Sequence, residues 1–325
     1  MSVEEVATAL FALCSVRSGS PELAASPSVD QRDPSSGRKR GSDIERAQLS
    51  DYRIYERIGS GNDAVVYRAT EKATLRVVAL KAMPKAGRSR TAVSRFRMEG
   101  QLLTDVIGPH PHVCRAFSWF ETASAVTIVL ECVSGGSLHS FVNDVGRPLA
   151  ERELRSVLEQ LAGALSFVHS KGYVHHDVKP ENVLVAPADG ELSVKLCDWS
   201  YACRIGDGAA PGRRAGSFAY TCPEVFAAAD DPAPPGADVA ATRPPVDVWS
   251  LGVTLYAISF KILPFGAKES NIRNRRFVTS QSELWPSRSF DFHALVDSML
   301  RVEADKRITL DRVREHPWFI QTALR

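Results

Sequence analysis

The sequence lacks any pair of cysteines spaced as CxxC, although it contains six cysteines. Zinc sites and small disulfide scaffolds repeat cysteines at short spacings, so this scatter argues against both. Isolated thiols are typical of a reducing compartment, and we expect a cytoplasmic protein. The basic triplet Arg38-Lys39-Arg40 leaves a nuclear location open as well.

Long hydrophobic runs and an excess of one charge are also missing. No apolar stretch approaches the roughly 18 residues of a membrane helix, so we expect no membrane partner. The apolar run at residues 6–14 follows Glu4 and Glu5 instead of basic residues, which argues against a secretory signal. The net charge is only +2, which gives no reason to expect nucleic acid as a partner.

Composition divides the chain into an extension, a main domain and a short tail. Residues 1–50 form the extension: Ser2 and Glu5 have the spacing of a helix cap for a short helix over 2–14, with disorder as the alternative, and the rest reads as a disordered tether. The short helix would dock on this chain or on a regulatory partner. Residues 51–320 form the globular domain, residues 227–245 a Pro- and Ala-rich insert expected as a surface loop, and residues 321–325 the tail.

The segment YVHHDVKPENVL at residues 173–184 concentrates reactive groups. It places Asp177, Lys179 and Asn182 in one loop between a helical stretch and an apolar strand. Phosphoryl transfer needs a carboxylate to orient the attacking hydroxyl, a cation for the phosphate and oxygen ligands for magnesium. These three side chains match those three tasks.

This segment resembles the catalytic loop of eukaryotic protein kinases, written HRDxKxxN. The ending ADKRITLDRVREHPWF resembles the calcium/calmodulin-dependent and related kinase branch. The resemblance implies an α+β bilobal fold with a β-rich N-lobe at 51–131, a hinge at 131–136 and a mainly helical C-lobe at 137–320. It also implies a serine/threonine protein kinase that uses ATP and Mg²⁺ and acts on protein substrates, and we expect a monomer. Because few residues follow Phe319, we expect no calmodulin-binding tail.

The same resemblance assigns the catalytic and metal-binding residues. Asp177 would orient and accept the proton of the substrate hydroxyl, Lys179 would stabilise the transferring phosphoryl group, and Ser217 would contact both. Asn182 and Asp198, the latter in Cys197-Asp198-Trp199-Ser200, would bind the metal.

Nucleotide binding is assigned to the glycine-rich loop, the following strands and the hinge. Lys81, in the sequence VALK, would hold the phosphates and pair with Glu99, for which a surface acid is the alternative interpretation. Val66 and Ala79 would cover the adenine from one side and Leu184 from the other. The expected nucleotide-contacting set is Ile58, Gly59, Ser60, Gly61, Asn62, Asp63, Ala64, Val66, Ala79, Lys81, Leu130, Glu131, Val133, Glu181 and Leu184.

Four residues depart from the family pattern. Ala64 replaces the third glycine of the loop, and Trp199 and Ser200 replace Phe and Gly after the metal-binding Asp. Ser200 is expected to be strained if it adopts the left-handed angles that glycine allows, so that Asp198 rarely flips outward. His176 replaces the arginine that receives activation-loop phosphate, and residues 203–216 contain no Ser, Thr or Tyr. These two absences predict an enzyme that is not controlled by phosphorylation of this loop, with a neutral variation at His176 as the alternative.

Further positions concern contacts within the C-lobe and the choice of substrate, and two alternative functions remain. Asp247 would brace the catalytic loop backbone, and Arg307 would pair with Glu224. Ser137 replaces a glutamate of arginine-directed relatives, so a strict requirement for arginine before the target is in doubt, although Glu181 remains. The alternative function is a pseudokinase scaffold. A small-molecule kinase is a third class, which the segment from Ser217 to Glu224 disfavours.

Overall fold

The computed structural model describes residues 48–61, 63–186, 192–207, 217–230, 236–278 and 285–320, except the side chains of Asp238 and Trp285. The expected helix at residues 2–14, Asn62 of the glycine-rich loop, most of the 203–216 segment and the tail at 321–325 lie outside the described residues.

The chain divides into two compact units. The first contains the described residues up to Phe96 together with Phe117–Cys132, and the second contains Arg97–Ala116 and the described residues from Val133 onward. The change between the units at Cys132 and Val133 falls inside the expected hinge. Residues 97–116, expected in the N-lobe, group with the second unit because Cys114 donates a backbone hydrogen bond to Leu196 and the backbone N–H of Leu196 donates to His112.

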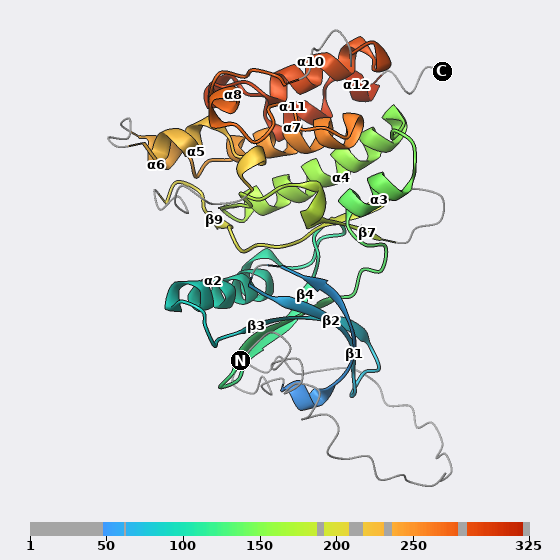
Figure 1. The fold of residues 1–325 in the computed structure, drawn as a ribbon, viewed down its shortest axis with the longest axis vertical. Coiled ribbons are helices and arrows are strands. Elements are labelled where there is room, and N and C mark those ends of the chain that lie inside the picture. Colours follow the sequence, from blue (N-terminus) through green and yellow to red (C-terminus); the bar gives the residue numbers. More distant parts are fainter. Residues whose placement is uncertain are drawn as a thin grey trace, which may run out of the picture. The chain divides into compact units, whose positions relative to one another are not determined.

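The first unit is built on a five-stranded sheet with strand order β1-β2-β3-β5-β4 (Figure 1). The strands are β1 (Tyr52–Ser60), β2 (Val65–Glu71), β3 (Val77–Pro84), β4 (Ala116–Glu121) and β5 (Ala125–Glu131). β-branched and aromatic residues favour these strands, and the β1–β2, β2–β3 and β3–β5 pairs are antiparallel. Helix α2 (Arg90–Gln101) follows β3 and continues into a π-helical turn at Leu102–Ile107.

Side-chain alternation gives the sheet two different faces. One face packs a hydrophobic cluster of Tyr52, Ala69, Val78, Leu80, Phe120 and Val129. Because alternate residues of a strand point to opposite faces, Lys81 and its cross-strand partners Val66 and Ile128 lie on the other face. The hydrophobic cluster therefore covers one face of the sheet, whereas Lys81 lies on the other face among buried apolar residues such as Ile128.

The second unit is mainly helical. Its helices are α3 (Leu138–Asp144), α4 (Glu151–Ser170), α5 (Pro223–Ala228), α6 (Ala237–Ala240), α7 (Pro245–Phe260), α8 (Glu269–Arg273), α10 (Phe290–Met299), α11 (Leu310–Arg314) and α12 (Pro317–Ile320). Its strands are β6 (Tyr173–Val174), β7 (Val183–Ala186), β8 (Ser193–Leu196) and β9 (Cys203–Arg204), paired as β6–β9 and β7–β8. Within the described residues, no helix combines the length and apolar character that crossing a membrane requires.

Two helices of this unit match their sequence patterns. In α4 the expected apolar stripe is buried: Leu154, Val157, Leu158, Leu161, Leu165 and Val168. In α7 nearly every residue from Val246 to Tyr256 is buried, as expected for a helix that is apolar on all sides. Figure 1 shows α4 and α7 next to each other in the second unit, where they form its centre.

The insert differs from the expected surface loop. Its described C-terminal part contains the short helix α6, and Ala241 and Thr242 are fully buried. The backbone oxygen of Thr242 accepts a hydrogen bond from the N–H of Gly206, 3.3 Å away, just after β9. The small side chains of Ala241 and Thr242 allow this part of the insert to be buried, whereas a surface loop would leave these residues exposed.

Candidate active site

Helix α7 holds the backbone of the loop between β6 and β7. Both carboxylate oxygens of Asp247 accept hydrogen bonds, from the N–H groups of His175 at 2.8 Å and His176 at 2.9 Å. About two turns further along α7, the hydroxyl of Thr254 donates to the carbonyl oxygen of Val178 at 3.3 Å. The expected bracing role of Asp247 is therefore confirmed, and Thr254 adds a contact that the sequence did not suggest.

The pKa of Asp247 reflects its hydrogen bonds. Burial would raise the pKa, but the hydrogen bond from His169 at 2.8 Å, together with the nearby histidines, outweighs burial and lowers the pKa to about 2. Asp247 is completely buried, so its charge is stabilised by donors alone.

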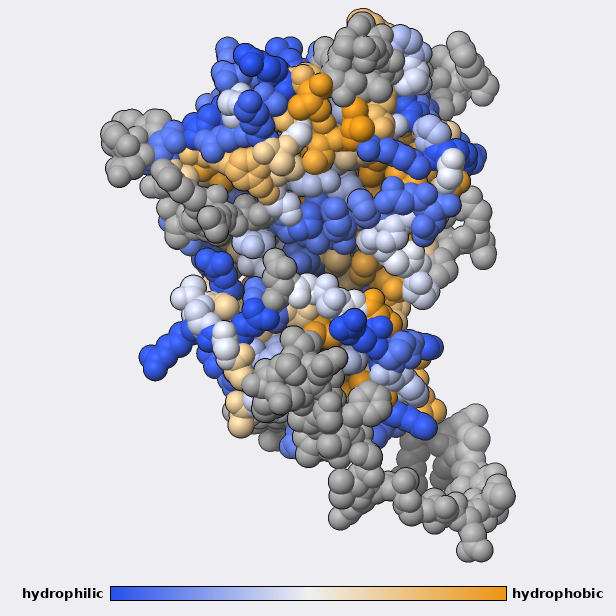
Figure 2. Space-filling model, in the orientation of Figure 1, coloured by the Kyte–Doolittle hydropathy of each residue, from blue (hydrophilic) through white to orange (hydrophobic). Residues whose placement is uncertain are grey.

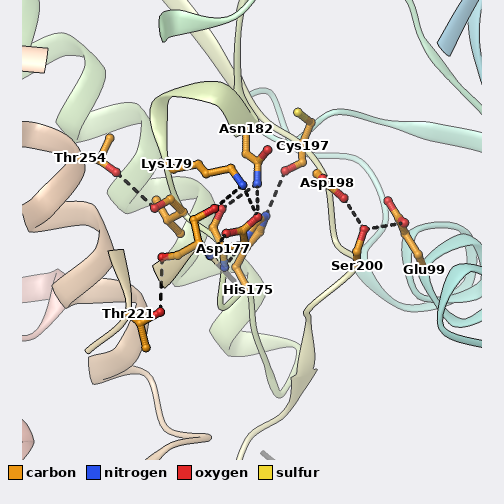
Figure 3. A network of polar contacts seen from close by, with 12 residues as sticks. Glu99, His175, Asp177, Lys179, Asn182, Cys197, Asp198, Ser200, Thr221 and Thr254 are labelled. Atoms are coloured by element: carbon orange, nitrogen blue, oxygen red, sulfur yellow. Dashed lines mark hydrogen bonds and ion pairs between the residues drawn. The ribbon is translucent and has the colours of Figure 1, made fainter. Parts of the chain in front are cut away.

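Asp177 lies at the centre of a network of donors. Its Oδ2 accepts from Lys179 Nζ at 2.8 Å and from Asn182 Nδ2 at 2.7 Å, and its Oδ1 accepts from the backbone N–H of Ser217 at 2.8 Å. Lys179 also donates to the Ser217 hydroxyl at 2.6 Å. The side chain of Asp177 is only 2% exposed. The structure thus brings together four of the residues that the sequence predicted, and Figure 3 shows three of them, Asp177, Lys179 and Asn182.

His175 supports Asp177 from behind. Its Nδ1 accepts the N–H of Asp177 at 3.2 Å, and its Nε2 lies 3.1 Å from the carbonyl oxygen of Cys197. This arrangement suits a neutral imidazole with the proton on Nε2, and burial lowers the pKa of His175 in agreement. The ring also packs edge-on against Trp199, with ring centroids 4.6 Å apart.

Asp198 follows Cys197, whose N–H donates to the carbonyl of Asn182 at 2.9 Å. Asp198 has a left-handed backbone with φ of 64°, as does His176 with φ of 68°. Ser200 is not among the described residues with positive φ, so the strain expected at Ser200 is not present there; it lies at Asp198 instead. That Asp198 rarely flips outward stays a prediction.

Glu99, near the end of α2, belongs to the second unit and contacts the same segment. It accepts hydrogen bonds from the N–H of Trp199 and from the hydroxyl of Ser200, both at 3.3 Å. Glu99 is 2% exposed, so the alternative of a surface acid is wrong. Lys81 belongs to the first unit, and its pairing with Glu99 stays a prediction.

The donor set around Asp198 suits magnesium. Within the described ranges, no group of three or more His, Cys, Asp or Glu side chains could hold a metal ion by itself. Both N–H bonds of the Asn182 amide point to Asp177, at 2.9 Å and 2.7 Å, which leaves its oxygen as an acceptor. One carboxylate and one amide oxygen match a Mg²⁺ ion that takes its remaining ligands from phosphates and water.

The first unit presents the other expected residues. Val66 lies opposite Gly59 and Lys81, and Ala79 lies opposite Leu130, so these five share one face of the sheet. The amino group of Lys81 lies 5.4 Å from the ring centre of Phe96 in α2. That these residues contact a nucleotide stays a prediction.

The glycine-rich loop is closed by two contacts. The N–H of Gly61 donates to the carbonyl of Ala64 at 2.8 Å, and Ala64 is buried in a way that accommodates its methyl group. Asp63 pairs with Arg88 at 2.6 Å, a contact that the sequence did not suggest. Ile58 and Ser60 lie at the end of β1.

The remaining expected residues lie at the strand ends and near the catalytic loop. Glu131 ends β5 in the first unit, whereas Val133, Glu181 and Leu184 belong to the second. Glu181 lies 3.5 Å from His139. Ser137 caps helix α3 by accepting the N–H of Ser140 at 3.2 Å, which gives this serine a structural task.

The second unit carries the expected buried ion pair. The guanidinium of Arg307 donates to Glu224 at 2.6 and 3.0 Å, and also to the carbonyl of Pro245 at 2.6 Å. The side chain of Arg307 is completely buried, and that of Glu224 is 9% exposed. The predicted pair is confirmed.

Comparison with known proteins agrees with this geometry. A family model described as a protein kinase domain matches residues 52–319. The chain is 33% identical over 277 residues to a maternal embryonic leucine zipper kinase of Danio rerio. The matched region covers 84% of this chain and 38% of the relative. It is 31% identical to the SNF1-related protein kinase catalytic subunit alpha of Arabidopsis thaliana, with 83% of this chain and 52% of the relative covered.

A third relative is covered along most of its own length. It is a probable myosin light chain kinase of Dictyostelium discoideum, 28% identical over 278 residues, with 84% of each chain covered. The chain therefore spans between about a third and most of the length of these relatives.

Proposed function

This chain belongs to the protein kinase family as a serine/threonine kinase domain, and we propose that it is an active enzyme, with Asp177 at its catalytic centre. Members of this family transfer a phosphoryl group from ATP, with magnesium, to protein hydroxyl groups. The observation that carries the proposal is the network in which Lys179, Asn182 and Ser217 all donate to the buried carboxylate of Asp177.

The roles follow from this geometry. Asp177 orients the substrate hydroxyl and accepts its proton, while Lys179, which already contacts both Asp177 and Ser217, stabilises the transferring phosphoryl group. Asn182 and Asp198 hold magnesium, which would neutralise phosphate charge when bound. Lys81, on the face of the first unit's sheet opposite the hydrophobic cluster, holds the phosphates.

The protein-substrate side of the site is supported by the segment after Ser217. Phe218 is 44% exposed and packs edge-on against Phe226 of α5, with ring centroids 5.1 Å apart. Figure 2 shows hydrophobic residues reaching the surface of the second unit near α5. An apolar surface beside the catalytic loop suits the side chain that follows the target serine or threonine in a peptide. Ser137 is engaged as a helix cap, so we propose substrates without a strict arginine requirement.

We also propose that phosphorylation of residues 203–216 does not control activity. His176 is 8% exposed, and burial lowers its pKa, so the ring is neutral and unsuited to receive a phosphate. Its Nε2 has no hydrogen-bond partner among the described residues. The backbone oxygen of the buried Thr242 instead accepts a hydrogen bond from Gly206, which supports an anchor without phosphate for the described start of this segment.

The cellular setting is part of the proposal. The five described cysteines, Cys114, Cys132, Cys197, Cys203 and Cys222, are free thiols, which supports a reducing compartment such as the cytoplasm or nucleus. We propose that the kinase domain acts as a monomer and that the N-terminal segment serves a regulatory partner.

The test measures phosphate transfer from radiolabelled ATP to a serine and threonine peptide library by the wild type, two site variants and one control variant. Asp177→Asn should lower kcat by roughly 10²–10⁴-fold, because the proton acceptor is lost. Lys81→Met should lower activity as well, whereas Asp311→Asn, a control at an exposed position of α11, should not. A wild type that transfers no phosphate would support the pseudokinase alternative and refute the proposal.

Control by phosphorylation needs a separate measurement. Wild-type protein is treated with a phosphatase, checked by mass spectrometry for phosphate on residues 203–216, and assayed before and after. Unchanged activity is expected, and a large loss after treatment would contradict the proposal.

A further inference from the structure

The hydroxyl of Ser200 lies between two carboxylates that are far apart in the sequence. It donates a short hydrogen bond to Asp198 Oδ1 and lies 3.3 Å from Glu99 Oε2. Figure 3 shows the side chain of Ser200 pointing between Asp198 on the catalytic side and Glu99 on α2. All three residues belong to the second unit.

The contacts of the Ser200 hydroxyl with Asp198 and with Glu99 differ in strength. A serine hydroxyl carries one hydrogen, whereas ionised carboxylates only accept. The hydrogen therefore lies with the closer oxygen, that of Asp198, and Glu99 is its second acceptor. Because Oδ1 of Asp198 accepts this hydrogen bond, the carboxylate is held in one orientation.

Glu99 receives two neighbouring donors. Its Oε1 accepts the N–H of Trp199 at 3.3 Å, and its Oε2 faces the hydroxyl of Ser200 at the same distance. Trp199 and Ser200 thus attach this segment to the end of α2. Trp199 donates through its backbone, which any residue other than proline can do, but the second contact depends on a hydroxyl at position 200.

The position of this hydroxyl gives it more than a packing role. Asp198 has a left-handed φ of 64°, which a residue other than glycine keeps only when its surroundings hold it. Glu99 is 2% exposed, so its contacts with this segment are shielded from water. Glycine or alanine at position 200 would leave Asp198 without this donor.

We propose that Ser200 is a positioning residue for magnesium: its hydroxyl fixes the Asp198 carboxylate and couples that carboxylate to Glu99 at the end of α2. The proposal rests on the proposed kinase function, in which Asp198 binds the metal. Groups that hydrogen-bond a metal-binding carboxylate commonly change metal affinity or activity by about 10–100-fold when they are removed. Ser200 therefore sets the magnesium concentration that the enzyme needs and the order of α2 when the nucleotide is bound.

The experiment compares wild type with Ser200→Ala, Ser200→Gly and Ser200→Thr in the full chain. Ser170→Ala is the matched control, because the Ser170 hydroxyl bonds only to Phe167 in its own helix among the hydrogen bonds of the described residues, at 2.7 Å. Activity is measured against Mg²⁺ concentration at saturating ATP. The KM for Mg²⁺ should rise about 10-fold in the Ala and Gly variants, with a smaller change in kcat. The Thr variant, which keeps the hydroxyl, and the control should resemble wild type.

A second readout does not depend on catalysis. Amide hydrogen exchange of residues 97–107 is followed with and without Mg²⁺ and ADP. Wild type, the Thr variant and the control should become protected when both are added. The Ala and Gly variants should show several-fold less protection at saturating concentrations.

The outcomes separate this inference from the proposed function. A wild type without phosphate transfer overturns the proposed function. An active wild type whose Ala and Gly variants match it in KM for Mg²⁺ and in exchange overturns the positioning role of Ser200. A Thr variant that behaves like the Ala variant also overturns it, because the hydroxyl would then not be the relevant group. If one variant does not fold, the other of the Ala and Gly pair decides.

Discussion

Replacing Asp247 by asparagine should destabilise the second unit strongly. In the wild type both oxygens of this fully buried carboxylate accept hydrogen bonds, from the backbone of His175 and His176, and one of them also from His169. Asparagine keeps one oxygen but turns an NH₂ group toward a backbone N–H, so at least one buried donor loses its acceptor. Each such loss costs about 1–3 kcal/mol, and we expect a decrease of about 2–4 kcal/mol in the free energy of unfolding.

The pH dependence of this difference can be derived from the pKa of about 2. The native pKa lies below the unfolded value of about 3.8, so the carboxylate stabilises the fold at neutral pH, and this contribution is lost as pH falls from about 4 toward 2. Linkage gives a loss of about 1 kcal/mol by pH 3. The gap between wild type and Asp247→Asn should therefore narrow by about that amount between pH 6 and pH 3.

Urea unfolding followed by tryptophan fluorescence measures both effects. Trp249 in α7 and Trp318 in α12 are buried in the same unit and report its unfolding. Asp311→Asn, at an exposed position of α11, is the control and should change the free energy of unfolding by less than about 0.5 kcal/mol. Two results would contradict this role of Asp247. One is an Asp247→Asn variant that is as stable as the control at pH 7, and the other is a difference in the free energy of unfolding between wild type and variant that stays constant down to pH 3.

Three further predictions concern the same unit. Arg307→Met should lower the free energy of unfolding by about 3–5 kcal/mol in urea titrations because Glu224 would remain buried without its partner, and a loss under 1 kcal/mol would count against this. Gly252→Ala should cost about 1–3 kcal/mol, since a Cβ there would lie 2.9 Å from that of Met299, whereas Gly163→Ala, with no atom within 4 Å, should stabilise by roughly 0.5–1 kcal/mol; equal effects would refute the packing argument. Burial raises the pKa of Cys203 to about 12, so its alkylation at pH 8, followed by mass spectrometry, should be at least about 100-fold slower in the native protein than in urea; similar rates would contradict this.

The parts of the fold that the sequence predicted depend on local pattern or on fixed spacing. The stripe from Leu154 to Val168 has a helical period that specifies one buried face, and the helix around Trp249 is apolar on all sides, which predicts complete burial. The catalytic loop could be predicted because Asp177, Lys179 and Asn182 lie close together in the sequence.

Other features depend on which segments meet in space, and the sequence carries little information about that. The contact of Ser200 with Glu99 joins residues that are distant in the chain, and the contact of Arg88 with Asp63 joins two loops. The insert shows the same limit. Its composition favours a solvated loop, but Ala241 and Thr242 are fully buried, and the backbone oxygen of Thr242 accepts a hydrogen bond from Gly206. No periodicity marks residues of this kind as buried.

The left-handed backbone at His176 and Asp198 has a consequence for protein engineering. Each such residue costs of order 1–3 kcal/mol, and glycine would remove that cost. A library screened only for heat resistance should therefore enrich glycine at these two positions, next to the chemistry it would damage. Thermostable versions of this domain are better sought by changing residues on the outer helices, with codons 176 and 198 held fixed.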